Sequence, residues 1–295
     1  MNSAVAPITY QVTHETIYDY TGTVTHGHHL AHLSPRNTWI QKVLSHTLTC
    51  EPKPVESTRI SDYFGNHICS FRITEPHDRL CVTNRSSIAI EYQGPDSSLA
   101  AQAWETALHK NAYQPEFIEL AEMRLASPHV ECLPQSQKFA SRFFSSQRPW
   151  LEAMLEMTCA IRAEFVYDPR ATTISTPVGE VFRTRAGVCQ DFAHLMLSCL
   201  RSLKLPARYV SGYILNEPPP GTEKLVGSDA SHAWVEAWCP GLGWVGFDPT
   251  NGKLANHEFI TLAWGRDYMD VTPLRGVVLG GGSHTLEVRV NVVRT

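Results

Sequence analysis

Two hydrophobic periodicities divide this chain, and they restrict the folds open to it more than any other feature of the sequence. Between residues 7 and 93, apolar and polar residues alternate in short runs separated by turn-forming residues. A period of two is typical of β-strands that bury one face. We therefore predict six or more short strands here, arranged as an all-β sandwich or a small barrel. The clearest runs cover residues 10–16, 43–49, 67–74 and 87–92.

The pattern changes at residues 94–98, and helical spacing follows. Helices are predicted over 99–126 (interrupted at Pro115), 151–165 and 188–203, and strands over 208–215, 232–239, 244–248 and 286–293. The sequence therefore predicts an α+β protein with four regions. These are an N-terminal β domain (1–95), a helical connecting segment (96–145), an α+β core (146–275) and a C-terminal turn and strand (276–295).

The composition argues against several classes of partner and location. A formal net charge of −4 gives no basic excess for binding nucleic acid or an anionic membrane surface. No stretch approaches about 18 uninterrupted apolar residues, as a membrane-spanning helix requires. Residues 1–10 lack the basic start and apolar run of a signal peptide. We therefore expect a cytoplasmic protein whose eight cysteines are mostly reduced, buried small hydrophobes.

Cys189 stands in the first turn of the helix predicted over 188–203. Free N–H groups and the dipole at a helix start favour a thiolate, and the same N–H groups could hold an oxyanion. Most free cysteines are packing residues, however, and Cys189 leans toward the apolar stripe of its helix. Its position alone leaves a reactive nucleophile and a buried, inert cysteine equally open.

His232 and Asp248 are candidate partners for this thiol. A hairpin centred near Pro240 places His232 directly opposite Asp248, where Cβ atoms lie about 4.5–5.5 Å apart. A carboxylate there can hold the tautomer and orientation of the imidazole and leave the other ring nitrogen for the thiol. Together, Cys189, His232 and Asp248 predict a catalytic nucleophile, its base and an orienting acid.

Other candidate sites have weaker support. His26, His28 and His32 share one face of a predicted strand, but no carboxylate lies near them in sequence, so exposed histidines are expected rather than zinc ligands. The glycines at 280–282 precede a strand, which favours a turn over a phosphate loop. Neither G-x-S-x-G nor H-E-x-x-H occurs, so serine-hydrolase and zincin signatures are missing. We predict no metal and no cofactor.

Two further features could shape a substrate cleft. Trp234, Trp238 and Trp244 could line a groove, although burial is the stronger alternative for at least one of them. The polar, proline-rich segment 216–229 could flank the cleft as a lid or form a plain solvent loop. Residue types do not separate these alternatives.

Several segments resemble the transglutaminase-like superfamily. They surround the three candidate residues at 187–194, 205–213, 232–236 and 243–251. The resemblance extends to 264–273 and to 33–36, which are similar to the bacterial members with an N-terminal β domain. It therefore covers nearly the whole chain.

The resemblance implies a papain-like core in which a nucleophile helix packs on an antiparallel sheet. Cys189 would attack the carbonyl carbon of a peptide or isopeptide amide and form a thioester. His232 would pass the thiol proton to the leaving amine, and Asp248 would orient His232. Water would make the protein a peptidase or amidase, and an amine would make it a transglutaminase; hydrolysis is slightly favoured.

The alternative is a non-catalytic binding or scaffold protein that retains this fold and uses its β domain as the interaction surface. The resemblance implies no calcium site, because calcium dependence belongs to animal members and no acidic calcium loop occurs in this sequence. It leaves open the substrate, the acceptor, the second oxyanion donor and the oligomeric state.

Overall fold

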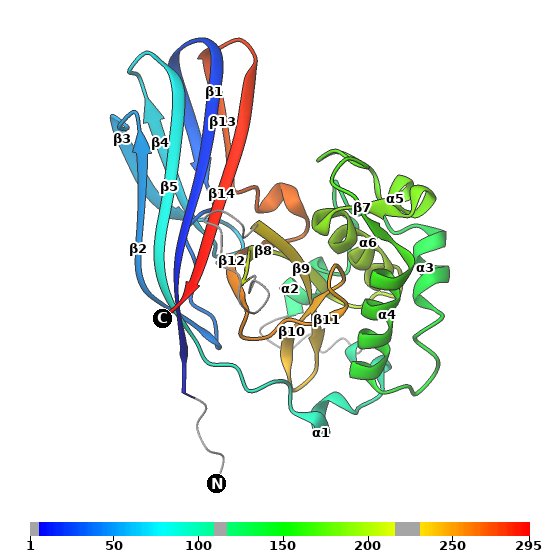
Figure 1. Ribbon diagram of the computed structural model, residues 1–295. Coiled ribbons are helices and arrows are strands. Elements are labelled where there is room, and N and C mark those ends of the chain that lie inside the picture. Colours follow the sequence, from blue (N-terminus) through cyan, green and yellow to red (C-terminus); the bar gives the residue numbers. More distant parts are fainter. Residues whose placement is uncertain (1–5, 109–116, 216–230) are drawn as a thin grey trace, which may run out of the picture.

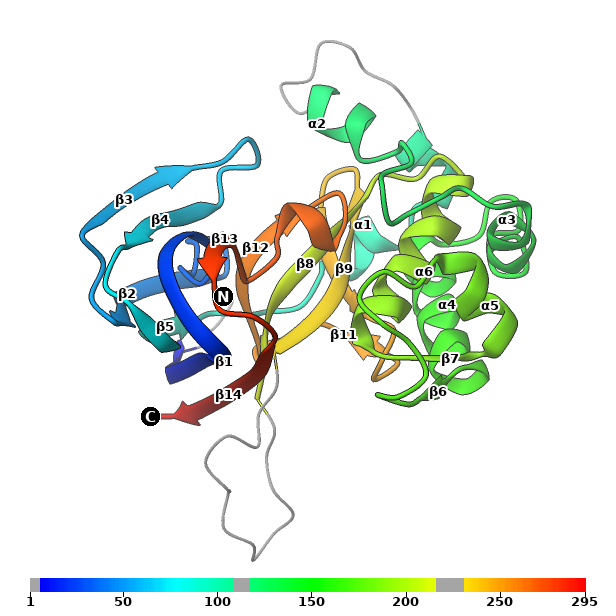
Figure 2. The same ribbon diagram turned by 90° about the horizontal axis from the view of Figure 1, so that it is seen from above.

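The N-terminal domain is one sheet folded over on itself. The structure, a computed structural model, describes residues 6–108, 117–215 and 231–295. The sheet has seven strands in the order β2-β5-β1-β4-β3, and β13 and β14 also pair with β1. Figure 2 shows the curled sheet beside the second lobe, which carries the helices. The strands are β1 (Ile8–Ala31), β2 (Gln41–Glu51), β3 (Glu56–Ser61), β4 (His67–Ile73), β5 (His77–Ile90), β13 (Leu274–Gly280) and β14 (His284–Arg294).

Strand β1 is the central strand of this domain and pairs with four others. Its first part pairs with β5 and β14, and its last part pairs with β4 and β13. The register is interrupted between Asp19 and Val24, where β1 bends. Across from the bend, Gly280, Gly281 and Gly282 all have positive φ (90°, 82° and 66°), and a Cβ on Gly280 would lie 2.3 Å from the Thr23 carbonyl oxygen. The glycine run is therefore a turn, as predicted, and it lets the partner strand follow the bend.

Two sequence expectations about this domain differ from the structure. The prediction of six or more short strands over residues 7–93 is wrong, because this span forms five strands and two of them, β1 and β5, run for 24 and 14 residues. The segment 276–295, set apart as a turn and one strand, contributes β13 and β14 to the N-terminal sheet. Alternation gives a strand's faces but neither its length nor its partner, and β13 is largely exposed.

The second lobe packs helices on one face of an antiparallel sheet, as predicted for an α+β core (Figure 1). The sheet order is β11-β10-β9-β8-β12. Its strands are β8 (Ala207–Ile214), β9 (Ser231–Cys239), β10 (Gly243–Asp248), β11 (Lys253–Leu254) and β12 (Phe259–Gly265). The helices are α1 (Ser97–Ala100), α2 (Phe117–Glu122), α3 (Pro134–Ala140), α4 (Trp150–Glu164), α5 (Val178–Thr184) and α6 (Cys189–Ser202), with 3-10 turns at Trp104–Leu108 and Tyr268–Asp270. A two-stranded parallel pair joins β6 (Val166–Tyr167) to β7 (Ala186–Gly187).

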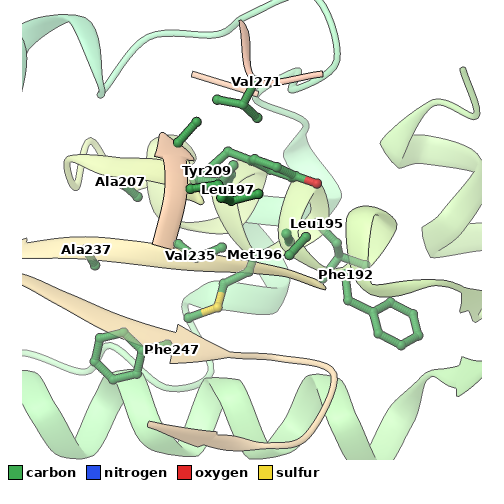
Figure 3. Packing of buried hydrophobic residues seen from close by; sticks show 14 of the residues in the cluster. Phe192, Leu195, Met196, Leu197, Ala207, Tyr209, Val235, Ala237, Phe247 and Val271 are labelled. Carbon is green, nitrogen blue, oxygen red and sulfur yellow. The ribbon is translucent and has the colours of Figure 1, made fainter. Parts of the chain in front are cut away.

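Helix α6 is buried on all sides rather than along one stripe. Its residues from Asp191 to Arg201 are all buried, because β8 and β9 cover one side and α3, α4 and α5 cover the other. Figure 3 shows Met196 of α6 packing toward Val235 and Phe247 of the sheet. The polar residues on its other side are bonded internally. Arg201, for example, donates to the carbonyl oxygens of Ala207 and Arg266.

Side-chain amides of the N-terminal domain cover the edge strand β12. Gln41 donates to the Thr261 carbonyl oxygen and accepts from the Thr261 N–H, both at 2.8 Å. Asn66 pairs in the same way with Trp264, at 2.8 and 2.9 Å. Each amide therefore replaces one residue of a missing neighbouring strand. These paired hydrogen bonds fix the two domains against each other.

Candidate active site

Cys189 is the first residue of α6, as predicted, and it is partly exposed. The preceding residue, Val188, is the N-cap and has no side-chain acceptor to offer the helix. The first hydrogen bond within the helix runs from the Phe192 N–H to the Val188 carbonyl oxygen. The backbone N–H of Cys189 therefore belongs to the group of helix-start donors that have no partner within the helix.

Asp191 compensates for the missing cap, and sequence reasoning did not find it. Its carboxylate accepts hydrogen bonds from the Val188 N–H at 2.8 Å and from the Thr172 hydroxyl at 2.6 Å. The residue is 2% exposed, and this burial raises the pKa of its carboxyl group. A Cβ on Gly187 would lie 2.8 Å from the carboxylate, so only glycine fits there. The available signal was an acid at the third position of the helix.

His232 and Asp248 lie within hydrogen-bonding distance. The imidazole Nε2 donates to Asp248 Oδ2 across 2.8 Å. Asp248 has no exposed surface, and its carboxylate also accepts from the side chain of Asn251 at 2.6 Å and from the N–H of Thr250 at 2.9 Å. The Cys189 side chain lies near His232, since its interaction with the imidazole contributes to raising the pKa of that group. Since Nε2 is engaged by Asp248, Nδ1 is the ring nitrogen left for the thiol.

The predicted register of the hairpin is wrong by two residues. Phe247 pairs with Val235, and Trp244 pairs with Trp238, so His232 does not lie directly opposite Asp248. The side chains meet diagonally instead, beyond the last paired residues of the hairpin. The turn begins later than assumed, because Gly241 and Gly243 carry the positive φ angles. The structure nevertheless brings all three predicted residues together.

Interactions among Cys189, His232 and Asp248 determine which of these side chains are charged. Burial by itself lowers the pKa of His232, but hydrogen bonds and charge interactions with Asp248 and Cys189 outweigh it and raise that pKa to about 10. Burial works against the Asp248 carboxylate, yet its bonds to His232 and Asn251 leave its pKa below the usual value. At neutral pH the site therefore holds an imidazolium against a carboxylate.

Aromatic rings form one wall beside His232. The ring centroids of Trp234 and Phe259 lie 6.4 and 6.0 Å from that of His232. Trp234 is buried, and a Cβ on Gly212 would come within 2.7 Å of its ring. The glycine therefore makes room for the indole to lie across the sheet.

A large pocket lies beside this wall rather than at the thiol. It has a volume of about 1000 Å³, and neither Cys189 nor His232 lines it. All three tryptophans named from the sequence, Trp234, Trp238 and Trp244, do line it. The loop predicted over 216–229 lies outside the described residues.

The N-terminal histidines do not converge. His28 bonds to the Ser70 hydroxyl, whereas His32 bonds to the Thr272 carbonyl oxygen and lies 3.6 Å from Asp62. Across the described ranges, no group of three or more His, Cys, Asp or Glu side chains could hold a metal ion. Among those same residues, no helix is both long and apolar enough to cross a membrane.

Comparisons with known proteins agree with this arrangement. Residues 10–89 match the bacterial transglutaminase-like N-terminal region, and residues 137–249 match the transglutaminase-like superfamily. An uncharacterised protein of Mycobacterium tuberculosis is 38% identical over 292 residues, which cover 96% of this chain and 92% of that protein. The chain belongs to the transglutaminase-like superfamily.

Two further comparisons concern its fold and its core. A structure described as "a Putative Cysteine Protease from Cytophaga hutchinsonii" superimposes with a TM-score of 0.79 over 99% of this chain and 92% of that one, at 20% sequence identity. This match confirms the predicted fold class. A protein-glutamine gamma-glutamyltransferase of Pseudomonas aeruginosa is 37% identical over 102 residues, which are 32% of this chain and 15% of that protein. Both of these proteins are described as enzymes.

Proposed function

We propose that this protein is a cysteine-dependent acyl-transfer enzyme that opens a peptide or isopeptide amide through a thioester on Cys189. The observation that carries the proposal is the 2.8 Å hydrogen bond between His232 and the buried Asp248, with the Cys189 side chain beside the same imidazole. A carboxylate, an imidazole and a thiol in this order form the arrangement that activates a nucleophile.

The first half-reaction consumes the amide. The Cys189 sulfur, its proton held on His232, attacks the carbonyl carbon and forms a C–S bond. The carbonyl oxygen becomes an oxyanion, and the helix-start N–H of Cys189 is placed to donate to it. Collapse breaks the C–N bond, and the departing amine takes the proton from His232. A thioester, a free amine and a neutral imidazole remain.

The second half-reaction restores the thiol. Water or an amine attacks the thioester carbonyl while His232 accepts its proton, and the C–S bond breaks. Water yields a carboxylic acid, as in a peptidase or amidase, and an amine yields a new amide, as in a transglutaminase. We favour hydrolysis, because the Cys189 side chain is partly exposed and open to water.

Thiol reactivity gives the direct test. Cys132 and Cys159 are exposed free cysteines in the same chain and serve as internal standards for alkylation by iodoacetamide at pH 7. We expect Cys189 to react fastest, and His232→Ala to slow its reaction without changing that of Cys132. Equal rates at all three cysteines would contradict the proposal.

Product analysis then identifies the reaction. A peptide library incubated with the protein, with and without an added primary amine, is scored by mass spectrometry for cleavage, deamidation and amine incorporation. Hydrolysis products without amine incorporation are expected. Cys189→Ala should abolish every product, and Cys132→Ala should abolish none.

A further inference from the structure

The pocket of about 1000 Å³ lies over the core sheet, at the interface between the two domains. Its floor comes from β8, β9, β10 and β12, and its walls from the N-terminal domain and the connecting segment. The amide pairs that join Gln41 to Thr261 and Asn66 to Trp264 hold these walls in place. The pocket is therefore part of a fixed interface between the two domains.

Exposed apolar side chains from separate segments gather at this pocket. Trp39, Tyr63 and Ile118 are 72%, 74% and 71% exposed, and all three line it. They come from the β1–β2 connection, the β3–β4 turn and α2. A single exposed apolar residue is ordinary, but three that converge on one hollow indicate a binding surface.

The size of the pocket favours part of a polymer over a small metabolite. Pockets for drug-sized ligands hold about 300–1,000 Å³, and this one lies at the upper limit. Tryptophan and tyrosine side chains, which dominate protein-binding hot spots, supply much of its lining. A polypeptide segment of several residues fits this volume and this chemistry.

The charges of the lining favour a cationic segment. Four carboxylates line the pocket, those of Asp96, Glu119, Glu122 and Glu236, against the guanidinium groups of Arg36 and Arg208. Both guanidinium groups already have partners within the protein.

Arg208 donates to Glu236 and Glu119 at 2.7 and 2.9 Å. Arg36 stacks on the Trp264 ring at 3.3 Å. Since Glu119 and Glu236 are paired with Arg208, the carboxylates left for an incoming lysine or arginine are those of Asp96 and Glu122. The exposed rings of Trp39 and Tyr63 offer aromatic faces in the same pocket.

We propose that this pocket binds a lysine- or arginine-containing segment of a polypeptide substrate, away from the bond that Cys189 attacks. The assignment of that polypeptide as a substrate rests on the proposed function. The pocket shares Trp234 and Phe259 with the wall beside His232. A segment held there is anchored next to the catalytic group without occupying it.

Binding is measured on the Cys189→Ala protein, so that the result is independent of any reaction. The probes are three synthetic dodecapeptides of one sequence that differ only in carrying four lysines, four glutamines or four glutamates, titrated by isothermal calorimetry. The lysine peptide is expected to bind most tightly and to weaken with added salt. Trp39→Ala and Glu122→Gln should each weaken it by about threefold to fivefold.

Matched variants away from the pocket provide the controls. Val277→Ala removes a side chain that is 74% exposed on β13, and Glu75→Gln removes an exposed charge from the N-terminal domain; neither should change binding. Equal affinity for all three peptides would overturn the proposal. So would binding of an oligosaccharide with the same dependence on Trp39 while the lysine peptide fails to bind.

If the lysine peptide binds but no product forms with any substrate, the inferred site stands and the proposed function fails. If products form but the three peptides bind equally, the proposed function stands and the inferred site fails.

Discussion

The thiol site and the interdomain pocket are neighbours along β9, yet they are built on opposite principles. At the thiol site, His232, Asp248 and Asp191 are buried and hydrogen-bonded. At the pocket, side chains such as those of Trp39 and Tyr63 are exposed to solvent and line a wide opening. Chemistry needs groups locked in one geometry, whereas recognition of varied chains needs exposed area. Variants should therefore affect the two regions differently.

Loss of the nucleophile should give the largest effect. Cys189→Ala removes the atom that forms the thioester, and kcat/KM is expected to fall by about 10⁴-fold or more. Assays on a chromogenic ester and on a peptide should both register the loss. Peptide binding to the pocket should persist, and its disappearance in this variant would break the separation between the two regions.

Asp248→Asn should give the second largest effect, and it carries the pH dependence. Burial lowers the pKa of His232, and without the Asp248 carboxylate the imidazole loses one of the two partners that raise this pKa to about 10. We expect kcat/KM to fall by about 10²–10⁴-fold, and its alkaline limb to move from near pH 10 toward the ordinary value of 6.5. A pH–rate profile from pH 5 to 11 tests both; an unmoved limb would contradict the assignment.

The His232–Asp248 pair should make the protein less stable as the pH rises. The folded-state pKa of His232 lies above its ordinary value of 6.5. Its contribution to the free energy of unfolding is therefore fully present below about pH 6.5 and is lost as the pH rises toward 10. The stability difference between the wild type and Asp248→Asn should therefore be larger at pH 6 than at pH 10.5. Urea unfolding at the two pH values measures it.

Asp191→Ala should have a smaller effect that is confined to the thiol site. It removes the acceptor for the Val188 N–H and the Thr172 hydroxyl, so the free energy of unfolding should fall by about 1–2 kcal/mol. Alkylation of Cys189 should slow relative to Cys132. Asp191→Asn keeps the shape and one acceptor oxygen and should recover only part of both losses, whereas a purely steric role for Asp191 would give full recovery.

The sequence predicted more of the thiol site than of its surroundings. Cys189, His232 and Asp248 could be named because a helix start and a hairpin are local patterns. For Asp191, only the bond to the Val188 N–H had a local signal, because its other partner, Thr172, comes from a separate segment. The pairing of β13 and β14 with β1 joins opposite ends of the chain, and no local periodicity encodes it. Part of the pocket was anticipated, because Trp234, Trp238 and Trp244 were named as residues that could line a groove. Its walls were not predicted, because they come from both domains.

The smallest effect should come from the exposed side of the pocket, and it sharpens the comparison most. Trp39 is 72% exposed and is not among the residues that contact His232 or Asp248. Trp39→Ala should leave kcat/KM for a small chromogenic ester unchanged and raise KM for a lysine-containing peptide by about threefold to fivefold. Trp39→Phe keeps an aromatic face and should recover most of that affinity. If the ester and the peptide slowed together, the pocket would be part of the reacting site, and the division between chemistry and recognition would be wrong.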